Sequence, residues 1–277
     1  MGGTSFVKRH ALPLYFVLAY AIAWGGILMA VGPGNIPGAG EQIERGFMWV
    51  FLAMLVGPSI AGIVMTALAD RRMGLHDLAA RLRRWRVPLR WYGAALLTAP
   101  LLLAVIMTAL SLFSPAFRPG ILTVSDKAGL IGMSLAGGLL AGFFEEIGWT
   151  GFATPRMQRR FGVLTGGLIL GAVWMLWHGL ADLWGSVEVY GAWYALHFLL
   201  WLAALTAYRV LMGWVHSRTA SLLVGQLMHA SFTGSQFLLS PAAASTAQNI
   251  LWYAFFAAGL WLLVAIMARR MKEERIA

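Results

Sequence analysis

Apolar residues in this chain are gathered into blocks of about 20, the length that an α-helix needs to cross a hydrocarbon core of about 30 Å. Hydrophobic residues make up 60% of the 277 positions and charged residues only 12%, whereas about 25% of an ordinary soluble domain is charged. The pattern predicts an all-α, polytopic membrane protein of about eight transmembrane helices. The expected spans are 11–31, 47–69, 91–113, 127–152, 163–183, 192–212, 219–240 and 247–268.

The basic residues predict an orientation for these spans. When the connecting segments are assigned alternately to two sides, one side carries only Arg45, Arg118 and Lys127. Lys and Arg are enriched in cytoplasmic loops, so the other side is predicted to be cytoplasmic, with both termini, in a multi-pass protein of the cell membrane. The net charge of +10 then indicates contact with anionic lipid head groups rather than with nucleic acid. The cytoplasmic set is Lys8, Arg9, Arg71, Arg72, Arg81, Arg83, Arg84, Arg86, Arg90, Arg156, Arg159, Arg160, Arg209, Arg218, Arg269, Arg270, Lys272 and Arg275.

The longest polar connection, at 70–90, is predicted to be a basic interfacial loop. Within it apolar residues recur at helical spacing among arginines, which favours a short amphipathic helix lying in the cytoplasmic interface. Those residues are Leu75, Leu78, Leu82 and Trp85. The chain contains no cysteine, which excludes disulfides and thiolate metal sites.

Ionisable side chains at membrane depth each cost roughly 3 kcal/mol to insert, so they suggest function by default. Glu145 lies eleven residues before Arg156, and His229 lies eleven residues after Arg218. At 1.5 Å per residue, both are about 16 Å from a cytoplasmic anchor, and His178 is at roughly 20–25 Å. The carboxylate and two imidazoles are therefore predicted to converge at one level. The full set is Glu145, Glu146, His178, His197 and His229.

Glu145 and Glu146 are adjacent, so they point about 100° apart on a helix and cannot share one task. One can face a water-filled cavity while the other faces a neighbouring helix. A carboxylate there can act as a general base on water, and two imidazoles, or an imidazole and a hydroxyl, can stabilise an oxyanion. The alternative for any single Glu–His pair is a structural hydrogen bond. His197 lies in plain surroundings and is predicted to pack or to hydrogen-bond.

Three short segments carry a family resemblance: "EEIGWT" at 145–150, "WMLWH" at 174–178 and "HASFT" at 229–233. In this order they resemble the CPBP family, the CAAX-protease and bacteriocin-processing (Abi) group of intramembrane proteases. Its motifs are Glu-Glu-xxx-Arg, Phe-xxx-His and His-xxx-Asn or Asp, with Trp174 here in place of Phe. The resemblance implies one membrane domain over 1–277. Its parts are variable N-terminal spans at 1–125, a protease core at 126–240, and a last span with a basic tail at 241–277.

The resemblance also implies a role for each matched residue. Glu145 activates a water for attack on a peptide carbonyl, and His178 assists or orients it. His229, together with the residue at 233, stabilises the oxyanion. Position 233 is Thr233, whose hydroxyl still donates one hydrogen bond.

Glu146 is implied to be structural and paired with an Arg four residues on, an i,i+4 neighbour on the same helix face. Position 150 is Thr150, so the expected cation is missing. Glu146 must therefore find another partner, for which Arg156 and Arg209 are the candidates, or stay protonated.

The expected function is that of an intramembrane endopeptidase, which hydrolyses a membrane-associated peptide or protein by glutamate-activated water. We expect its cavity to open toward the cytoplasm. One alternative is a catalytically degraded family member that acts as a membrane scaffold or bacteriocin-immunity protein. Another is a small proton-coupled transporter, although no inverted repeat is seen. No cofactor is expected; zinc held by Glu145, His178 and His229 is the alternative, without an HExxH motif to support it.

Overall fold

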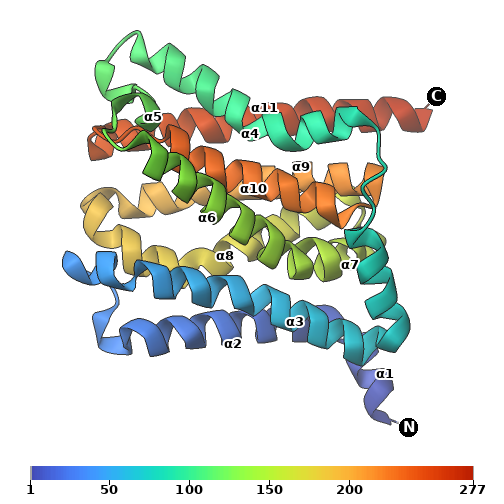
Figure 1. Cartoon of the computed structure of the whole chain (residues 1–277). Coiled ribbons are helices and arrows are strands. Elements are labelled where there is room, and N and C mark those ends of the chain that lie inside the picture. Colours follow the sequence, from blue (N-terminus) through green and yellow to red (C-terminus); the bar gives the residue numbers. More distant parts are fainter. Residues whose placement is uncertain (1, 277) are drawn as a thin grey trace.

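The computed structural model describes residues 2–276 and is mostly helical, with no strand in that part of the chain. Three short 3₁₀ turns and one π-helical segment, η3 (Trp149–Ala153), interrupt the α-helices. Figure 1 follows the chain through α1 (Gly2–Arg9), α2 (Ala11–Val31), α3 (Glu41–Leu82), α4 (Leu89–Ser111), α5 (Gly120–Thr123), α6 (Lys127–Gly148), α7 (Thr154–Phe161), α8 (Val163–Tyr190), α9 (Tyr194–Thr219), α10 (Leu222–Leu239) and α11 (Thr246–Ile276).

The predicted fold class is confirmed, since every predicted span lies mainly in a helix: α2, α3, α4, α6, α8, α9, α10 and α11. Six stretches of the described chain are long and apolar enough to cross a membrane. One of them, 163–219, contains both α8 and α9, and α10 is not among the six. The number of crossings therefore stays a prediction.

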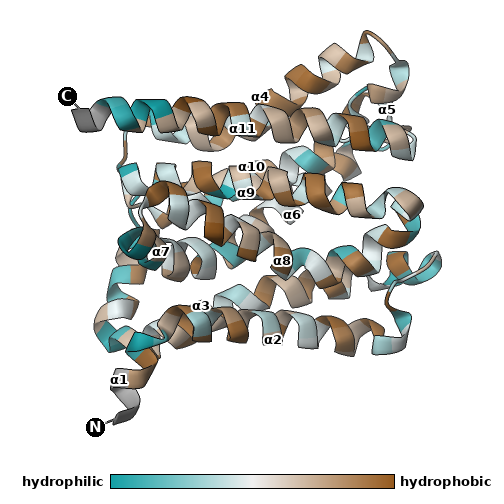
Figure 2. Ribbon diagram, turned by 180° about the vertical axis from the view of Figure 1, so that it is seen from behind, coloured by the Kyte–Doolittle hydropathy of each residue, from teal (hydrophilic) through white to brown (hydrophobic). Residues whose placement is uncertain are grey.

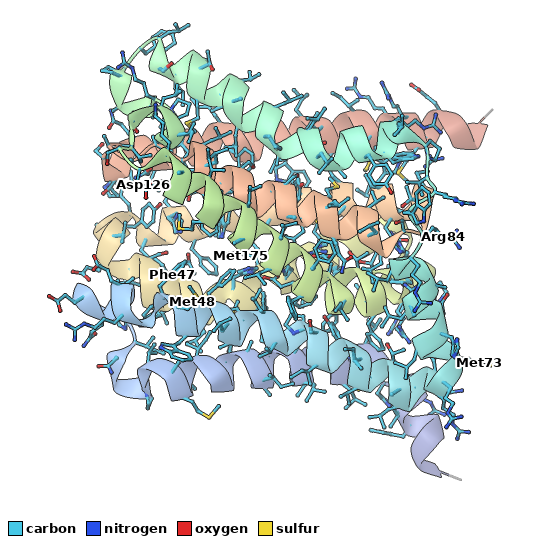
Figure 3. All side chains as sticks on the ribbon, in the orientation of Figure 1. Phe47, Met48, Met73, Arg84, Asp126 and Met175 are labelled. Carbon is cyan, nitrogen blue, oxygen red and sulfur yellow. The ribbon has the colours of Figure 1, made fainter. Side chains whose placement is uncertain are left out.

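The long helices lie side by side in one bundle, and the two ends of the chain emerge at the same end of it (Figure 1). Arg84 and Met73 lie at this end, which we call the terminal end, whereas Asp126 and Phe47 lie at the opposite end (Figure 3). Hydrophilic residues gather near the helix ends and hydrophobic residues along their middles (Figure 2). This is the distribution expected of a bundle that crosses a bilayer, although the side that each end faces stays a prediction.

Helix α3 breaks at Arg71, whose φ of 58° and ψ of −149° are not helical. A left-handed φ is costly for a residue with a Cβ atom, so the break is held by its surroundings. The chain beyond it turns aside but remains helical to Leu82 (Figure 1). The 70–90 segment is therefore largely helix rather than loop. Leu78 packs inward with 8% of its surface exposed, while Trp85 is 59% exposed.

Close contact between α6 and α10 sets the level of the candidate site. A methyl group at Gly142 would overlap the backbone of Gln226 and Ala230, and one at Gly138 would overlap the Ala230 carbonyl. Only glycine lets the two backbones approach this closely, as small residues do at helix interfaces in membranes. The approach brings the end of α6, with its two glutamates, beside the middle of α10.

Candidate active site

The predicted site residues from three helices meet at one cavity of about 610 Å³. Glu145 comes from α6, His178 from α8, and His229 and Thr233 from α10. Figure 1 shows all three helices in the middle of the bundle. The level estimated from helix rise alone therefore corresponds to a shared space in the folded chain.

Glu145 faces this cavity from a nearly buried position, with 4% of its surface exposed. The indole Nε1 of Trp174 donates a hydrogen bond to its Oε2 over 3.2 Å. Phenylalanine, which the family motif has at this position, could not make that bond. A carboxylate held at a cavity wall by one donor keeps lone pairs for a water molecule.

Glu146 points away from the cavity and is completely buried. Arg209 of α9 donates from Nη1 to Oε2 and from Nη2 to Oε1, each over 2.8 Å. His229 Nδ1 lies 2.7 Å from Oε1, and the Thr150 hydroxyl donates to Oε2. Two-pronged pairing of this kind is among the strongest ways to satisfy a buried carboxylate. The adjacent glutamates therefore have different surroundings, as their helical positions predict, while their roles stay a prediction.

The partner of Glu146 is Arg209, one of the two arginines proposed from the sequence. The other, Arg156, instead pairs with Asp70 and donates to the Phe152 carbonyl over 2.9 Å. The assignment of Arg209 to a cytoplasmic connection is wrong, because α9 continues to Thr219 and Arg209 is fully buried within it.

The two imidazoles are oriented by hydrogen bonds at Nδ1. In His178 this nitrogen lies 2.9 Å from the Trp174 carbonyl oxygen, and in His229 it lies 2.7 Å from Glu146 Oε1. Both partners are acceptors, so Nδ1 carries a hydrogen in each ring. Nε2 is then the nitrogen left for a molecule in the cavity, a division of roles common in catalytic histidines.

Trp174 is the centre about which the site is arranged. Its ring meets His178 and His229 edge-on, with centroids 5.4 and 5.2 Å away. The Arg209 guanidinium lies over the same ring, 4.0 Å from its centroid. One rigid side chain contacts Glu145, both imidazoles and Arg209, and it therefore fixes their positions relative to one another.

The chain directly after the two glutamates is the π-helix η3 (Trp149–Ala153), which contains Thr150. Wider turns of this kind occur often at functional sites. The Thr154 hydroxyl donates to the Trp149 carbonyl over 2.8 Å, and Trp149 packs edge-on against Tyr15 and Trp177. The widened turn is therefore held in the core, and it places the Thr150 hydroxyl against Glu146.

The cavity extends from Glu145 toward the end of the bundle opposite the termini. Its lining includes Ile43 and Phe47 from the first turns of α3, Ser186 near the end of α8, and Ser240 after α10. Phe47 lies at the same end as Asp126 (Figure 3). If the termini are cytoplasmic, this opening faces the other side of the membrane. The expectations of cytoplasmic termini and a cytoplasmic opening are therefore incompatible in this structure.

Three polar residues of α10, together with Ser240 directly after it, line the cavity along its length. The three helical residues recur at intervals of four and three, which places them on one helix face. Gln236 Nε2 is buried, with no hydrogen-bond partner among the residues that the structure describes. A buried donor of this kind costs about 1–3 kcal/mol unless the cavity contents satisfy it. This polar stripe consists of His229, Thr233, Gln236 and Ser240.

Asp182 of α8 was missed in the sequence, although it lies one helical turn after His178. Its Oδ1 is 3.1 Å from His197 Nε2 and accepts a hydrogen bond from Ser186 over 3.0 Å. The His197 ring also stacks on Tyr190 at 3.8 Å. The prediction that His197 packs or hydrogen-bonds is therefore confirmed. In the sequence, Asp182 could have been recognised as the partner of His197 because it is an acidic residue near the end of an apolar span.

Tyr15 of α2 is a second residue that the sequence did not reveal. It is fully buried, and a methyl group on Gly148 would overlap its hydroxyl. With Trp149 and Phe152, also fully buried, it fills the core beside the end of α6. Neither these side chains nor the Glu146–Arg209 pair are among the described residues that line the cavity.

Metal ligation has no geometric support in the part of the chain described here. No group of three or more His, Cys, Asp or Glu side chains within residues 2–276 is arranged to hold a metal ion. The expectation of a reaction without a cofactor stays a prediction for experiment.

Residues 127–235 match a family model described as "Type II CAAX prenyl endopeptidase Rce1-like". This region contains all the predicted catalytic residues. A "CAAX prenyl protease 2" from Methanococcus maripaludis is 34% identical over 67 residues, an alignment that covers 22% of this chain. The chain spans only 25% of that relative's length in the alignment. Both matches support the resemblance drawn from the three sequence motifs.

Proposed function

We propose that this chain, a member of the CPBP family, is an intramembrane endopeptidase. Its reaction is the hydrolysis of a peptide bond in a membrane-associated peptide or protein. The observation that carries the proposal is the separation of the two glutamates. Glu145 is held at a cavity wall by Trp174, while the charge of Glu146 is met by Arg209.

In the proposed reaction, a water molecule lies between the Glu145 carboxylate and His178 Nε2. Glu145 takes one proton from it as the oxygen attacks the carbonyl carbon of the scissile bond. The carbonyl oxygen becomes an oxyanion, which accepts hydrogen bonds from the Thr233 hydroxyl and from the Nε2–H of His229. When the C–N bond breaks, Glu145 returns the proton to the leaving amine nitrogen. One water and one peptide bond give one carboxylic acid and one amine.

The structural role of Glu146 in this scheme is to hold the oxyanion-stabilising ring. Its Oε1 accepts from His229 Nδ1 and also from Arg209 Nη2. The imidazole is thereby fixed in orientation by a carboxylate that another helix neutralises. Such preorganised donors account for a large share of rate enhancement in many enzymes.

The test is cleavage of a membrane-presented peptide by purified protein in liposomes. Glu145→Gln keeps the shape of the side chain but removes the base, and we expect a loss of about 10²–10⁴-fold in rate. His178→Ala and His229→Ala should also abolish measurable turnover. His76→Ala, an exposed histidine, is the matched control. Wild-type rates in all three site variants would refute catalysis at this cavity.

The same assay separates the alternatives. A catalytically degraded scaffold would bind the peptide without cleaving it, and Glu145→Gln would leave the binding unchanged. A proton-coupled transporter would acidify or alkalinise loaded vesicles in a Glu145-dependent manner without producing fragments. Cleavage retained in excess chelator would exclude zinc, whereas loss of cleavage that added zinc restores would support it.

The substrate class is open to a direct comparison. The name of the Methanococcus relative points to prenylated protein C-termini, so prenylated and unprenylated versions of one peptide form the natural pair of substrates. We propose that the peptide enters through the opening lined by Phe47 and Ser240. We also propose that the basic terminal end contacts anionic lipid head groups.

A further inference from the structure

A second pocket, of about 410 Å³, lies at the terminal end of the bundle, away from the candidate active site. Five of its lining residues are basic and come from two separate elements, α1 and α7. Asp70 is the one carboxylate in its described lining. We call it the basic pocket; its cationic residues are Lys8, Arg9, Arg156, Arg159 and Arg160.

The single acidic residue of the lining, Asp70, already forms an ion pair with one of these cations. Asp70 Oδ2 pairs with Arg156 Nη2, and the same guanidinium donates from Nη1 to the Phe152 carbonyl. It also lies over the Phe152 ring, 3.6 Å from the centroid. Arg156 is therefore a fixed wall of the pocket. The other four cations face a lining that contains no further carboxylate.

The backbone builds this pocket as a defined concavity. The straight part of α3 ends at the Arg71 break, directly after Asp70. The π-helix η3 lies between α6 and α7, and Arg159 and Arg160 lie in the last turn of α7. The remaining lining is small or apolar: Ala11, Leu12, Pro13 and Ala69.

These features select a ligand class. Clustered cations repel one another, and an anion with two or more charges relieves that repulsion. Arginine presents a planar fork that matches phosphate oxygens, and lysine adds a point charge. Basic pockets between helices at the cytoplasmic surface are suited to phosphorylated head groups. The apolar part of the lining can accept carbon atoms attached to the phosphate.

We propose that the basic pocket binds a phosphate-bearing anion. Anionic lipid head groups and soluble phosphate esters share this chemistry. The proposal does not depend on the protease activity. It differs from a general attraction of the basic terminal end to the bilayer, because it assigns binding to one concave site. The basic segment that follows α3, with Arg83, Arg84 and Arg86, is not part of that site.

The test uses the full chain in nanodiscs of phosphatidylcholine, with or without phosphatidylglycerol, and native mass spectrometry to count retained anionic lipid. A triple variant, Lys8→Gln, Arg159→Gln and Arg160→Gln, removes three pocket charges. The matched control, Arg83→Gln, Arg84→Gln and Arg86→Gln, removes three exposed charges from the same end of the bundle. We expect retention to fall about tenfold or more in the pocket variant and to be nearly unchanged in the control.

A second arm distinguishes the two sources of phosphate. Glycerol phosphate is titrated against protein in neutral detergent while thermal unfolding is followed. Stabilisation that disappears in the pocket variant assigns the site to soluble anions as well as lipids. Lipid retention without that stabilisation assigns it to head groups. Equal loss of lipid in the pocket and control variants, with no stabilisation by glycerol phosphate, would overturn the proposal.

Discussion

Arg209 of α9 and Glu146 of α6 are joined by two parallel hydrogen bonds, each 2.8 Å long, in a place where neither side chain reaches solvent. Arg209 supplies the cation that the family motif would place at position 150. The cation comes from another helix, and Thr150 adds a hydroxyl to the same carboxylate. The ion pair that the family motif forms within one helix is therefore formed here between two helices, α6 and α9.

Breaking this pair by removing one partner should be strongly destabilising. Arg209→Met leaves a buried carboxylate without its cation, and we expect a loss of about 3–5 kcal/mol in the free energy of unfolding. Adding Glu146→Gln should recover much of that loss. A double-mutant cycle in detergent measures the coupling, with Arg156→Met and Glu146→Gln as the control cycle. Additive effects for Arg209 and Glu146 would contradict the assignment.

Moving the cation back to position 150 should succeed only when Arg209 is removed. Thr150 is buried, with its side chain against Gly225, so Thr150→Arg alone adds a second cation to filled space. We expect low folded yield and reduced thermal stability for this variant. Combining it with Arg209→Met should recover folded protein. A double variant less stable than both single variants would show that the two positions are not interchangeable.

Gln236 should position the substrate rather than take part in the chemical step. It lies seven residues after His229 on the same face of α10, so about 10.5 Å farther along the helix axis. An extended peptide covers that distance in about three residues. We predict that Gln236→Leu raises KM several-fold with little change in kcat, the signature of lost uniform binding. Gln42→Leu, an exposed glutamine, is the control; a fall in kcat at constant KM would oppose this role.

The side of the membrane on which the cavity opens can be measured directly, because the chain has no native cysteine. Single replacements Ser125→Cys, beside Asp126, and Arg84→Cys place one thiol at each end of the bundle. With cytoplasmic termini, a membrane-impermeant maleimide should label Ser125→Cys in intact cells. It should label Arg84→Cys only after permeabilisation. The reverse labelling pattern would show that the enrichment of Lys and Arg in cytoplasmic loops does not predict the orientation of this protein. It would also show that the cavity opens toward the cytoplasm.

Much of the site was predictable because it depends on distances along one chain. Apolar blocks of membrane-spanning length gave the helices, and the constant rise of an α-helix placed Glu145, His178 and His229 at similar depth. The angular step between neighbouring residues predicted that Glu145 and Glu146 face different surroundings. The motif pattern assigned the same residues independently. Each of these properties is local, so no knowledge of helix packing was needed.

Tertiary structure decided the contacts made across helices. Which arginine reaches Glu146, whether Asp182 meets His197, and which end of the bundle the cavity opens toward depend on how each helix is rotated against its neighbours. Close packing at positions such as Gly138 and Gly142 constrains those rotations. The sequence by itself determined which helices form and what chemistry they carry, since both follow from local pattern. The partners of the buried charges were decided only by folding, because side chains far apart in the chain come within hydrogen-bond distance only once the helices pack.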